Sequence, residues 1–226
     1  MTLTVCLLNW KRPANLRRIL DRLAEQTLRA QMAIFLWNNA LEPFHHPAVD
    51  WQVDSGRNVM CPPRWWMAAQ AETQFAVSLD DDLLPADPRV LEDAVRVARR
   101  QTADRAIGPF GVILQPGRPY AQHLDARCPP QDTPVDMVQG RCLLVRTAAL
   151  RSALKLGDLC GDVGGEDDII VCGALAAGRR RHHLVPGIFQ GRFEELPTGN
   201  EAIERRPDHA RRREAVRQRW FVAAQK

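Results

Sequence analysis

The sequence has 226 residues, of which 45% are hydrophobic and 26% are charged, and its formal net charge at pH 7 is +4. These values fit one globular domain with an ample core. The charge is only mildly basic, so it does not by itself indicate binding to nucleic acid. No apolar run approaches the length of a membrane span. No signal peptide is recognised, because a Lys-Arg pair follows the first short apolar stretch.

The six cysteines are widely scattered and form neither a C-x-x-C pair nor a Cys/His spacing typical of zinc sites. Several lie within apolar runs, where Cys behaves as a small buried hydrophobic residue. We therefore expect a protein with reduced thiols that works in the cytoplasm.

The chain begins with a strand, a helix and a second strand. Apolar residues 3–8 predict the first strand, which ends at the segment Asn9-Trp10-Lys11-Arg12-Pro13. Apolar residues then recur at intervals of three and four, which predicts an amphipathic helix to about residue 28. The second strand, over 32–37, stops at Asn38-Asn39. This order indicates a βαβ unit, in which the strands pair in parallel with a right-handed crossover.

The alternation continues to about residue 100. A short strand at 49–53, a helix at 64–73 and a buried strand at 75–79 lead to the carboxylates Asp80, Asp81 and Asp82. Asp87-Pro88 then begins a further amphipathic helix. The first 100 residues therefore predict an α/β half-domain of the nucleotide-binding type.

The second half has a less regular pattern, and no linker or repeat interrupts it. We expect an α/β fold, one Rossmann-like domain with a mostly parallel central sheet and flanking helices. The expected elements are an interrupted strand at 106–115, a polar loop at 118–134, strands at 137–138 and 142–145, a helix at 148–154, a flexible segment at 156–165, a helix at 166–178, a basic strand at 179–185 and a charged helix near 201–223.

The acidic triplet of Asp80, Asp81 and Asp82 is the most unusual feature of the chain. A buried strand that ends in adjacent negative charges needs a counter-charge, because neighbouring carboxylates repel one another. Mg²⁺ or Mn²⁺ would supply it, since these ions bind one or two carboxylates together with substrate phosphates. Ligands of α/β sheets also bind at the carboxyl ends of strands. The alternative is a solvated acidic loop that caps the next helix.

A second acidic cluster, Glu166-Asp167-Asp168, opens a predicted helix. Acidic residues favour a helix N-terminus through capping and the helix dipole, which accounts for one or two of them. A carboxylate here would also suit a base for an acceptor hydroxyl, or would stabilise an oxocarbenium-like transition state. His182 and His183 follow three arginines, and the positive surroundings favour a structural role over metal binding.

Taken in order, these motifs resemble those of GT-A glycosyltransferases, most closely the exostosin-type family of α-N-acetylhexosaminyltransferases. The resemblance covers roughly residues 3–185. It implies a single GT-A domain in which 1–100 bind the nucleotide sugar, 101–190 hold the acceptor and the catalytic acids, and 191–226 form a C-terminal loop and helix. The matching motifs are Asn9-Trp10-Lys11-Arg12-Pro13, Trp37-Asn38-Asn39, Asn58 with Arg64, Ser78-Leu79-Asp80-Asp81-Asp82, and Gly165-Glu166-Asp167-Asp168-Ile169.

The resemblance also implies roles for the acidic residues. Asp82 would bind Mn²⁺ or Mg²⁺ and Asp80 would approach the ribose, with Asp81 beside them. Glu166 and Asp167 would lie beside the acceptor and the transferred sugar as the catalytic acids. Because Asp168 is a third acid in the row, the acidic pair of the family could also be aligned one position later in this sequence. Inverting GT-A enzymes use the Asp after the Glu as a base, whereas the exostosin-type family retains configuration, so the stereochemistry stays open.

Basic and amide side chains complete the expected donor site. Arg12 and Arg64 are placed to donate charged hydrogen bonds to a diphosphate, which the planar guanidinium fits well, although a surface role is the alternative. Asn39 and Asn58, together with Asn38, lie at strand ends or turns where a base or ribose would bind. Asn is equally typical of such turns.

We therefore expect a metal-dependent glycosyltransferase of the hexosyltransferase type that moves a sugar from a nucleoside-diphosphate sugar, UDP-linked, to an acceptor hydroxyl. The acceptor would be a glycan, a lipid-linked molecule or a small molecule, and membrane contact would be at most peripheral. One alternative is a sugar-1-phosphate nucleotidyltransferase, but its usual Gly-rich loop is missing after the first strand. Another is a non-catalytic sugar-nucleotide-binding protein.

Overall fold

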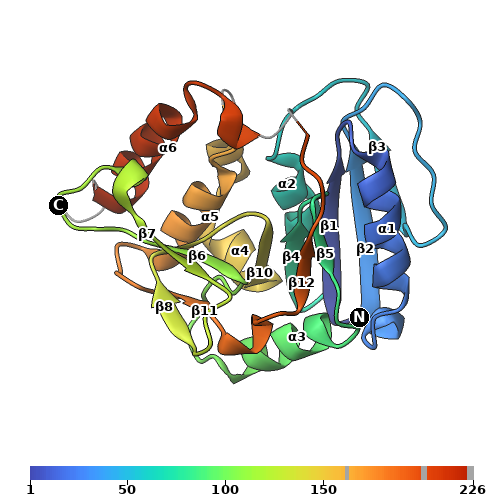
Figure 1. Ribbon diagram of the computed structural model, residues 1–226, viewed down its shortest axis with the longest axis horizontal. Helices are drawn as coiled ribbons and strands as arrows, with labels where there is room; N and C mark the ends of the chain where they lie inside the picture. Colours follow the sequence, from blue (N-terminus) through green and yellow to red (C-terminus); the bar gives the residue numbers. More distant parts are fainter. Residues whose placement is uncertain (161–162, 200–202, 223–226) are drawn as a thin grey trace.

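The computed structural model describes residues 1–160, 163–199 and 203–222. Within these ranges the central sheet has five strands in the order β10-β4-β1-β2-β3 (Figure 1). Neighbouring strands from β4 to β3 run parallel, and β10 pairs antiparallel with β4. The expected mostly parallel sheet is therefore confirmed. The strand bounds are Leu3–Asn9 for β1, Met32–Asn38 for β2, Trp51–Asp54 for β3, Phe75–Leu79 for β4 and Cys142–Arg146 for β10.

The opening βαβ unit forms as expected, with β1 and β2 in parallel register from Leu3 opposite Met32 to Asn9 opposite Asn38. Helix α1 (Pro13–Ala24) begins with Pro in its first turn, where the missing N–H costs nothing. It ends four residues before the expected position, at Ala24 instead of about 28, because a turn and a short 3₁₀ helix (Arg29–Gln31) lead into β2.

Successive side chains along the strands point to opposite faces of the sheet, and those on each face pack into a separate buried hydrophobic cluster. Leu3, Val5 and Leu7 of β1 pack with α1 and with α3 (Val90–Arg100). On the other face, Cys6 packs with α2 (Pro63–Gln70), α4 (Thr147–Ala153) and α5 (Asp167–Ala176). The sheet is thus covered by helices on both sides, which is the arrangement expected of a buried parallel sheet.

The second half builds smaller antiparallel sheets against the edge at β10. Strands β6 (Phe110–Ile113), β7 (Leu124–Arg127) and β9 (Met137–Val138) form one of them. Strand β8 (Thr133–Val135) pairs with β11 (His183–Val185), and β5 (Leu83–Pro85) pairs with β12 (Phe193–Glu195). The expected loop at 118–134 is therefore wrong, because it holds β7 and the start of β8.

Several expected boundaries are shifted. The strand at 106–115 is reduced to β6. Before β6, the chain at Gly108 passes so close to β10 that an added Cβ would lie 2.1 Å from the Cys142 carbonyl oxygen. Helix α5 ends at Ala176, where left-handed Ala177 and Gly178 reverse the chain. Arginines 179–181 form a turn and only His183–Val185 are a strand.

The charged C-terminal helix is shorter than expected. Within the described residues it consists of a 3₁₀ turn (Ile203–Arg205), α6 (His209–Arg217) and a π-helical turn (Gln218–Val222), while 200–202 and 223 lie outside them. Figure 1 shows α6 at the end of the molecule farthest from α1. Other 3₁₀ turns cover Tyr120–Gln122, Leu156–Leu159 and Gly187–Phe189. No helix in the described ranges is both long and apolar enough to span a membrane.

Candidate active site

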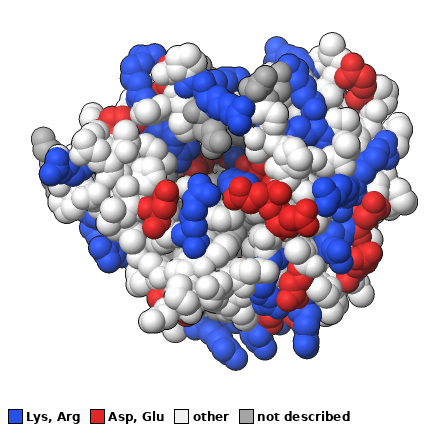
Figure 2. All heavy atoms as spheres, in the orientation of Figure 1, with Lys and Arg blue, Asp and Glu red and all other residues white. Residues whose placement is uncertain are grey.

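A cavity of about 730 Å³ opens beside the carboxyl ends of β1, β2 and β4. Figure 2 shows a hollow on this face of the molecule, with acidic atoms deep inside and basic atoms on several sides of it. The carboxyl edge of a parallel sheet is where α/β proteins bind their ligands. The sequence-predicted residues that line the cavity are Arg12, Asn39, Asn58, Arg64, Asp80, Asp81 and Asp82.

The acidic triplet follows β4 directly, and its backbone is held from two sides. The N–H of Asp80 donates to the carbonyl of Arg141 at 2.9 Å, and the N–H of Leu196 donates to the carbonyl of Asp82 at 2.8 Å. The first contact extends the β4–β10 ladder, and the second extends the β5–β12 ladder. Two strands distant in sequence therefore fix the orientation of the triplet.

Arg64 of α2 links the triplet to the second acidic cluster. Its Nη1 donates to Asp80 Oδ1 at 2.5 Å and to the Gly140 carbonyl at 3.0 Å. Its Nε and Nη2 donate to the carboxylate of Asp167 at 2.7 and 3.2 Å. Burial opposes the charge on the guanidinium, but Asp167 and Asp80 outweigh it and hold the Arg64 pKa well above its ordinary value.

Arg12 and Arg141 neutralise the other two carboxylates of the triplet. Arg12 Nη1 lies 2.6 Å from Asp81 Oδ1 and 3.2 Å from Asp82 Oδ2. Arg141 donates to Asp82 Oδ1 at 3.2 Å and to Glu195 at 2.9 Å. Burial raises the pKa of Asp81 to about 7, although Arg12 works in the opposite direction. Each carboxylate of the triplet thus has a guanidinium against it.

The second acidic cluster lies mainly behind the cavity wall. Asp167 is fully buried, and its Oδ2 also accepts from Trp65 Nε1 at 2.5 Å. Glu166 is paired with Arg212 at 2.9 Å. Of this cluster, within the described residues, only Asp168 lines the cavity. Glu166 and Asp167, which the resemblance would place beside the acceptor and the sugar, do not line this cavity.

Asp168 faces the cavity from the first turn of α5 and is held firmly there. Its Oδ2 accepts from the Gly140 N–H at 3.2 Å and from Arg213 Nη2 at 3.0 Å. Its Oδ1 accepts from the N–H of Ile169 at 2.8 Å. The acidic start of α5 therefore serves local hydrogen bonding as well as the site.

The amide side chains hold the loop that borders the cavity. Asn39 accepts from the N–H of Val59 at 3.0 Å and donates to the carbonyl of Met60 at 3.1 Å. Asn58 accepts from the N–H of Met60 at 2.8 Å, and Met60 has a positive φ of 65°. A strained non-glycine residue beside a cavity is typical of a functional site. Asn38 is buried at the end of β2, where it contacts Asn9 and Asp54.

The residues fit a divalent cation only together with a ligand. Within the described ranges, no cluster of three or more His, Cys, Asp or Glu side chains could hold a metal ion. The triplet lines the cavity with three carboxylates. Mg²⁺-type ions use one or two such carboxylates and complete their shell with phosphate and water. His183 is not part of this site, because its ring contacts the Ala106 N–H and the Cys172 carbonyl in the buried core.

Further residues of the cavity were not predicted from the sequence. Arg141 pairs with Asp82 and with Glu195, and Arg213 pairs with Asp168. The backbone carbonyl of Thr198 accepts from Arg12 Nε at 3.0 Å. Arg141 had one available signal: it immediately precedes a strand candidate, so antiparallel pairing with β4 would place it opposite the triplet. Glu195, Arg213 and Thr198 reach the cavity through tertiary contacts that no local sequence pattern indicates.

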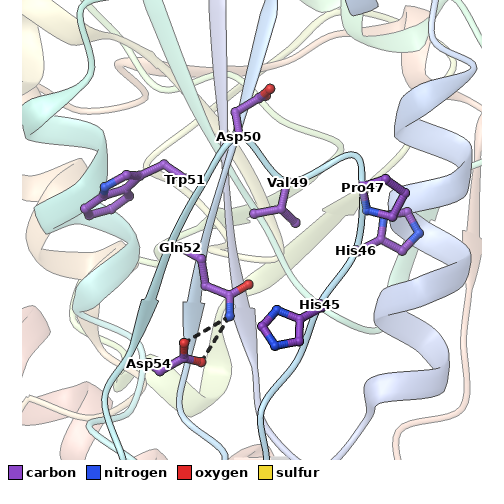
Figure 3. A pocket seen from close by; sticks show the side chains of 8 residues that line it. All are labelled: His45, His46, Pro47, Val49, Asp50, Trp51, Gln52 and Asp54. Carbon is purple, nitrogen blue, oxygen red and sulfur yellow. Dashed lines mark hydrogen bonds between the residues drawn. The ribbon is translucent and has the colours of Figure 1, made fainter.

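A second hollow, of about 600 Å³, lies at the edge strand β3 (Figure 3). Its polar side chains are occupied locally: Gln52 Nε2 donates to Asp54 and to the Phe44 carbonyl, and Asp50 Oδ2 accepts from the Ile34 N–H. Trp51 packs on Phe35 with ring centroids 5.1 Å apart. This hollow holds none of the expected site residues, so the first cavity is the candidate active site.

No protein-family model and no curated protein matches the sequence, but solved structures match the fold. One is the structure of TarS residues 1–349 from S. aureus in complex with UDP-GlcNAc, with a TM-score of 0.61 and 12% sequence identity. The match covers 91% of this chain and 61% of the TarS chain. Another is the mannosyltransferase PcManGT from Pyrobaculum calidifontis with GDP-Man and Mn²⁺, with a TM-score of 0.53, 16% identity, and 84% of this chain covering 58% of that one.

The protein has the GT-A glycosyltransferase fold. This confirms the fold class expected from the motifs. The chain spans only 58% and 61% of the length of these two structures. Within the GT-A fold, the cavity at the carboxyl ends of β1, β2 and β4 corresponds to the ligand-binding edge of the sheet.

Proposed function

We propose that the protein is a hexosyltransferase that moves a sugar from a nucleoside-diphosphate sugar, UDP-linked, to an acceptor hydroxyl. The observation that carries this proposal is the pairing of Arg12 and Arg64 with the acidic triplet inside one cavity. Guanidinium groups bind diphosphate oxygens, and cleavage of the glycosidic bond leaves a diphosphate whose negative charge must be stabilised. The motif order that resembles the exostosin-type family supports the same assignment.

Asp82, with Asp80 or Asp81, would hold Mn²⁺ or Mg²⁺ together with the donor phosphates. When bound, such an ion supplies Lewis-acid stabilisation of the leaving diphosphate. The carboxylates suit this role, since hard cations prefer oxygen ligands. The mannosyltransferase PcManGT, whose structure is a complex with GDP-Man and Mn²⁺, supports this role.

The arginines have a role of their own in this proposal. Arg12 holds Asp81 and Asp82, and the Arg12 side chain is 15% exposed. A diphosphate that enters the cavity offers Arg12 a second set of acceptor oxygens. Arg12 would then turn from the carboxylates to the phosphates, so donor binding and release of the carboxylates would be coupled.

The acids of the second cluster act mainly by positioning in this proposal. Asp167 fixes Arg64 through two of its guanidinium nitrogens, and Glu166 holds Arg212. Asp168 is the acid of this cluster that the acceptor would meet, because it lines the cavity. The sugar would therefore bind between the triplet on the donor side and Asp168 on the opposite wall.

The proposal is tested by following donor cleavage with a panel of UDP-, GDP- and CMP-sugars, with and without Mn²⁺. We expect slow Mn²⁺-dependent hydrolysis of at least one UDP-sugar, which Asp82→Asn abolishes. The matched control is Asp125→Asn, because Asp125 lies on the exposed strand β7 and does not line the cavity. A wild-type protein that cleaves none of these donors and binds none of their nucleotides would remove the basis for this function.

A further inference from the structure

The two walls of the cavity differ in charge. The donor wall, at the strand ends, carries the acidic triplet with Arg12 and Arg64. The rest of the lining, which we call the second wall, comes from β7, β12, residues 139–141, the start of α5 and the C-terminal segment 203–213. Its charged residues are Arg127, Arg141, Arg205, Arg206 and Arg213 against Asp168 and Glu195. Basic side chains therefore outnumber acidic ones on the second wall.

Arg206 is a cation of this wall without a carboxylate partner among the described residues. Its Nη2 lies 3.6 Å from the sulfur of Met60, and its side chain is exposed. Thioether sulfur is a weak acceptor, so the contacts within the described residues leave most N–H groups of the Arg206 guanidinium available.

Arg127 is only partly neutralised. It lies 3.7 Å from Glu195 with 54% of its side chain exposed, and Glu195 is already bound by Arg141 at 2.9 Å. Glu195 thus pairs with two guanidinium groups, and the positive charge of the more distant one, Arg127, is only partly compensated. We call Arg127 and Arg206 together the basic rim.

Arg213 provides an independent observation deeper in the same wall. Arg213 is only 5% exposed. Its Nη2 donates to Asp168 at 3.0 Å, and its Nη1 donates to the Gly165 carbonyl. Its buried Nε has no hydrogen-bond partner among the described residues. A buried donor left without an acceptor costs about 1–3 kcal/mol, which a ligand oxygen in the cavity would recover.

The donor diphosphate does not account for Arg127, Arg206 and Arg213, because among the described residues none of the three contacts the acidic triplet. The diphosphate would bind at the strand ends, where Arg12 and Arg64 supply positive charge. Guanidinium groups that approach from several directions suit a group with several acceptor oxygens, of which a phosphate ester is the best match. We infer, on the basis of the proposed function, that the acceptor carries a phosphate ester and that Arg127, Arg206 and Arg213 bind it.

The test uses glycerol 3-phosphate, with uncharged glycerol as the comparison, titrated into protein saturated with UDP and Mn²⁺. We expect binding of glycerol 3-phosphate alone, weakened about tenfold in Arg127→Gln and again in Arg206→Gln, since one charged hydrogen bond is lost in each. The UDP dissociation constant should change less than twofold. Both side chains are exposed, so both variants should fold. Arg118→Gln is the control, because this exposed arginine does not line the cavity.

A parallel arm separates the two sources of the phosphate. Phosphatidylcholine vesicles with and without phosphatidic acid replace glycerol 3-phosphate, and rim-dependent binding to the acidic vesicles alone assigns a lipid-linked acceptor. Equal binding of glycerol and glycerol 3-phosphate, with no rim-dependent vesicle binding, overturns the inference. Rim variants that weaken UDP instead overturn it as well, since the rim would then serve the donor. If the wild type binds no UDP, the proposed function fails, and the same titrations of the free protein still decide whether the rim binds phosphate.

Discussion

Arg64 and Asp167 are 103 positions apart in the sequence, yet Arg64 Nε lies 2.7 Å from Asp167 Oδ2 in the buried interior. The same guanidinium contacts Asp80 at the end of β4. One arginine therefore joins the acidic triplet, which follows β4, to helix α5 in the second half of the chain. The position of this guanidinium sets the shape of the cavity floor, and Asp167 sets the position of the guanidinium.

Asp167→Asn should destabilise the protein and weaken donor binding together. Removing one partner of a buried ion pair leaves an uncompensated charge and costs about 3 kcal/mol or more. Arg64 would also lose its fixed orientation toward the cavity, so we expect UDP affinity to fall about tenfold. Urea denaturation and calorimetric titration of UDP measure the two effects.

The matched control for this change is Glu194→Gln, which removes an exposed pair with Arg18 at 3.1 Å. Exposed pairs contribute at most about 1 kcal/mol, so little should change. A variant Asp167→Asn that keeps full UDP affinity but loses sugar transfer would contradict the positioning role and would favour Asp167 as a base.

Arg12→Gln should bind Mn²⁺ more tightly than the wild type when no nucleotide is present. Without the guanidinium, Asp81 and Asp82 have more uncompensated negative charge, and we expect a gain of about tenfold. Electron paramagnetic resonance of free Mn²⁺ measures it directly. Arg18→Gln in the helix that follows Arg12 is the control, because among the described residues Arg18 pairs with Glu194 and does not line the cavity. Identical Mn²⁺ affinity in Arg12→Gln and wild type would show that Arg12 does not compete with the cation.

Gly140→Ala should displace Arg64. An added Cβ would lie 2.8 Å from Arg64 Nη2, and the guanidinium cannot retreat easily because Asp80 and Asp167 hold it. Overpacking of this kind costs about 1–3 kcal/mol, and UDP affinity should fall with it. Thermal unfolding and UDP titration provide the readouts. Gly157→Ala is the control, since its added Cβ meets nothing within 4 Å. Equal behaviour of both variants would mean that the Arg64 position tolerates the shift.

His183 should make stability depend on pH between about 6.5 and 3. Burial, together with the neighbouring His182, lowers the pKa of His183 from 6.5 to about 3. Below 6.5 the unfolded chain takes up a proton that the folded protein refuses, so the free energy of unfolding falls as the pH falls. The loss approaches about 1.4 kcal/mol per pH unit in this window.

His183→Asn removes this titration while it keeps an acceptor for the Ala106 N–H. Urea denaturation at pH 7 and pH 5 should show a smaller pH effect in the variant than in the wild type. Parallel pH dependence in both proteins would mean that His183 does not titrate on unfolding.

The sequence predicts the parts of the fold whose signals are local. The βαβ opening, α2, α3 and β4 follow from apolar periodicity and from Pro and Asp at helix starts, and they appear close to the expected positions. Strands β5 and β12 were not predicted, because each is three residues long and becomes a strand only through pairing with the other. The same pairing brings Glu195 to the cavity.

The candidate site divides in the same way. Asp82 and Arg64 lie in the cavity as the motifs suggested, because both follow from elements of the regular half. The burial of Asp167 could not be read from the sequence, since a helix-opening acid looks the same whether it faces a cavity or an arginine behind it. Arg206 and Arg213 reach the cavity through the packing of the C-terminal segment against α5 and the Tyr120 turn, which leaves no local pattern.

The most direct test of the central claim is a calorimetric titration of UDP into the wild-type protein with and without Mn²⁺, repeated for Arg64→Gln and Asp82→Asn. We predict that UDP binds the wild type, that Mn²⁺ tightens this binding, that Asp82→Asn loses the Mn²⁺ effect, and that Arg64→Gln binds more weakly under both conditions. Absence of UDP binding by the folded wild type in both conditions, or equal affinity in all three proteins, would contradict the claim that this cavity holds a nucleoside diphosphate.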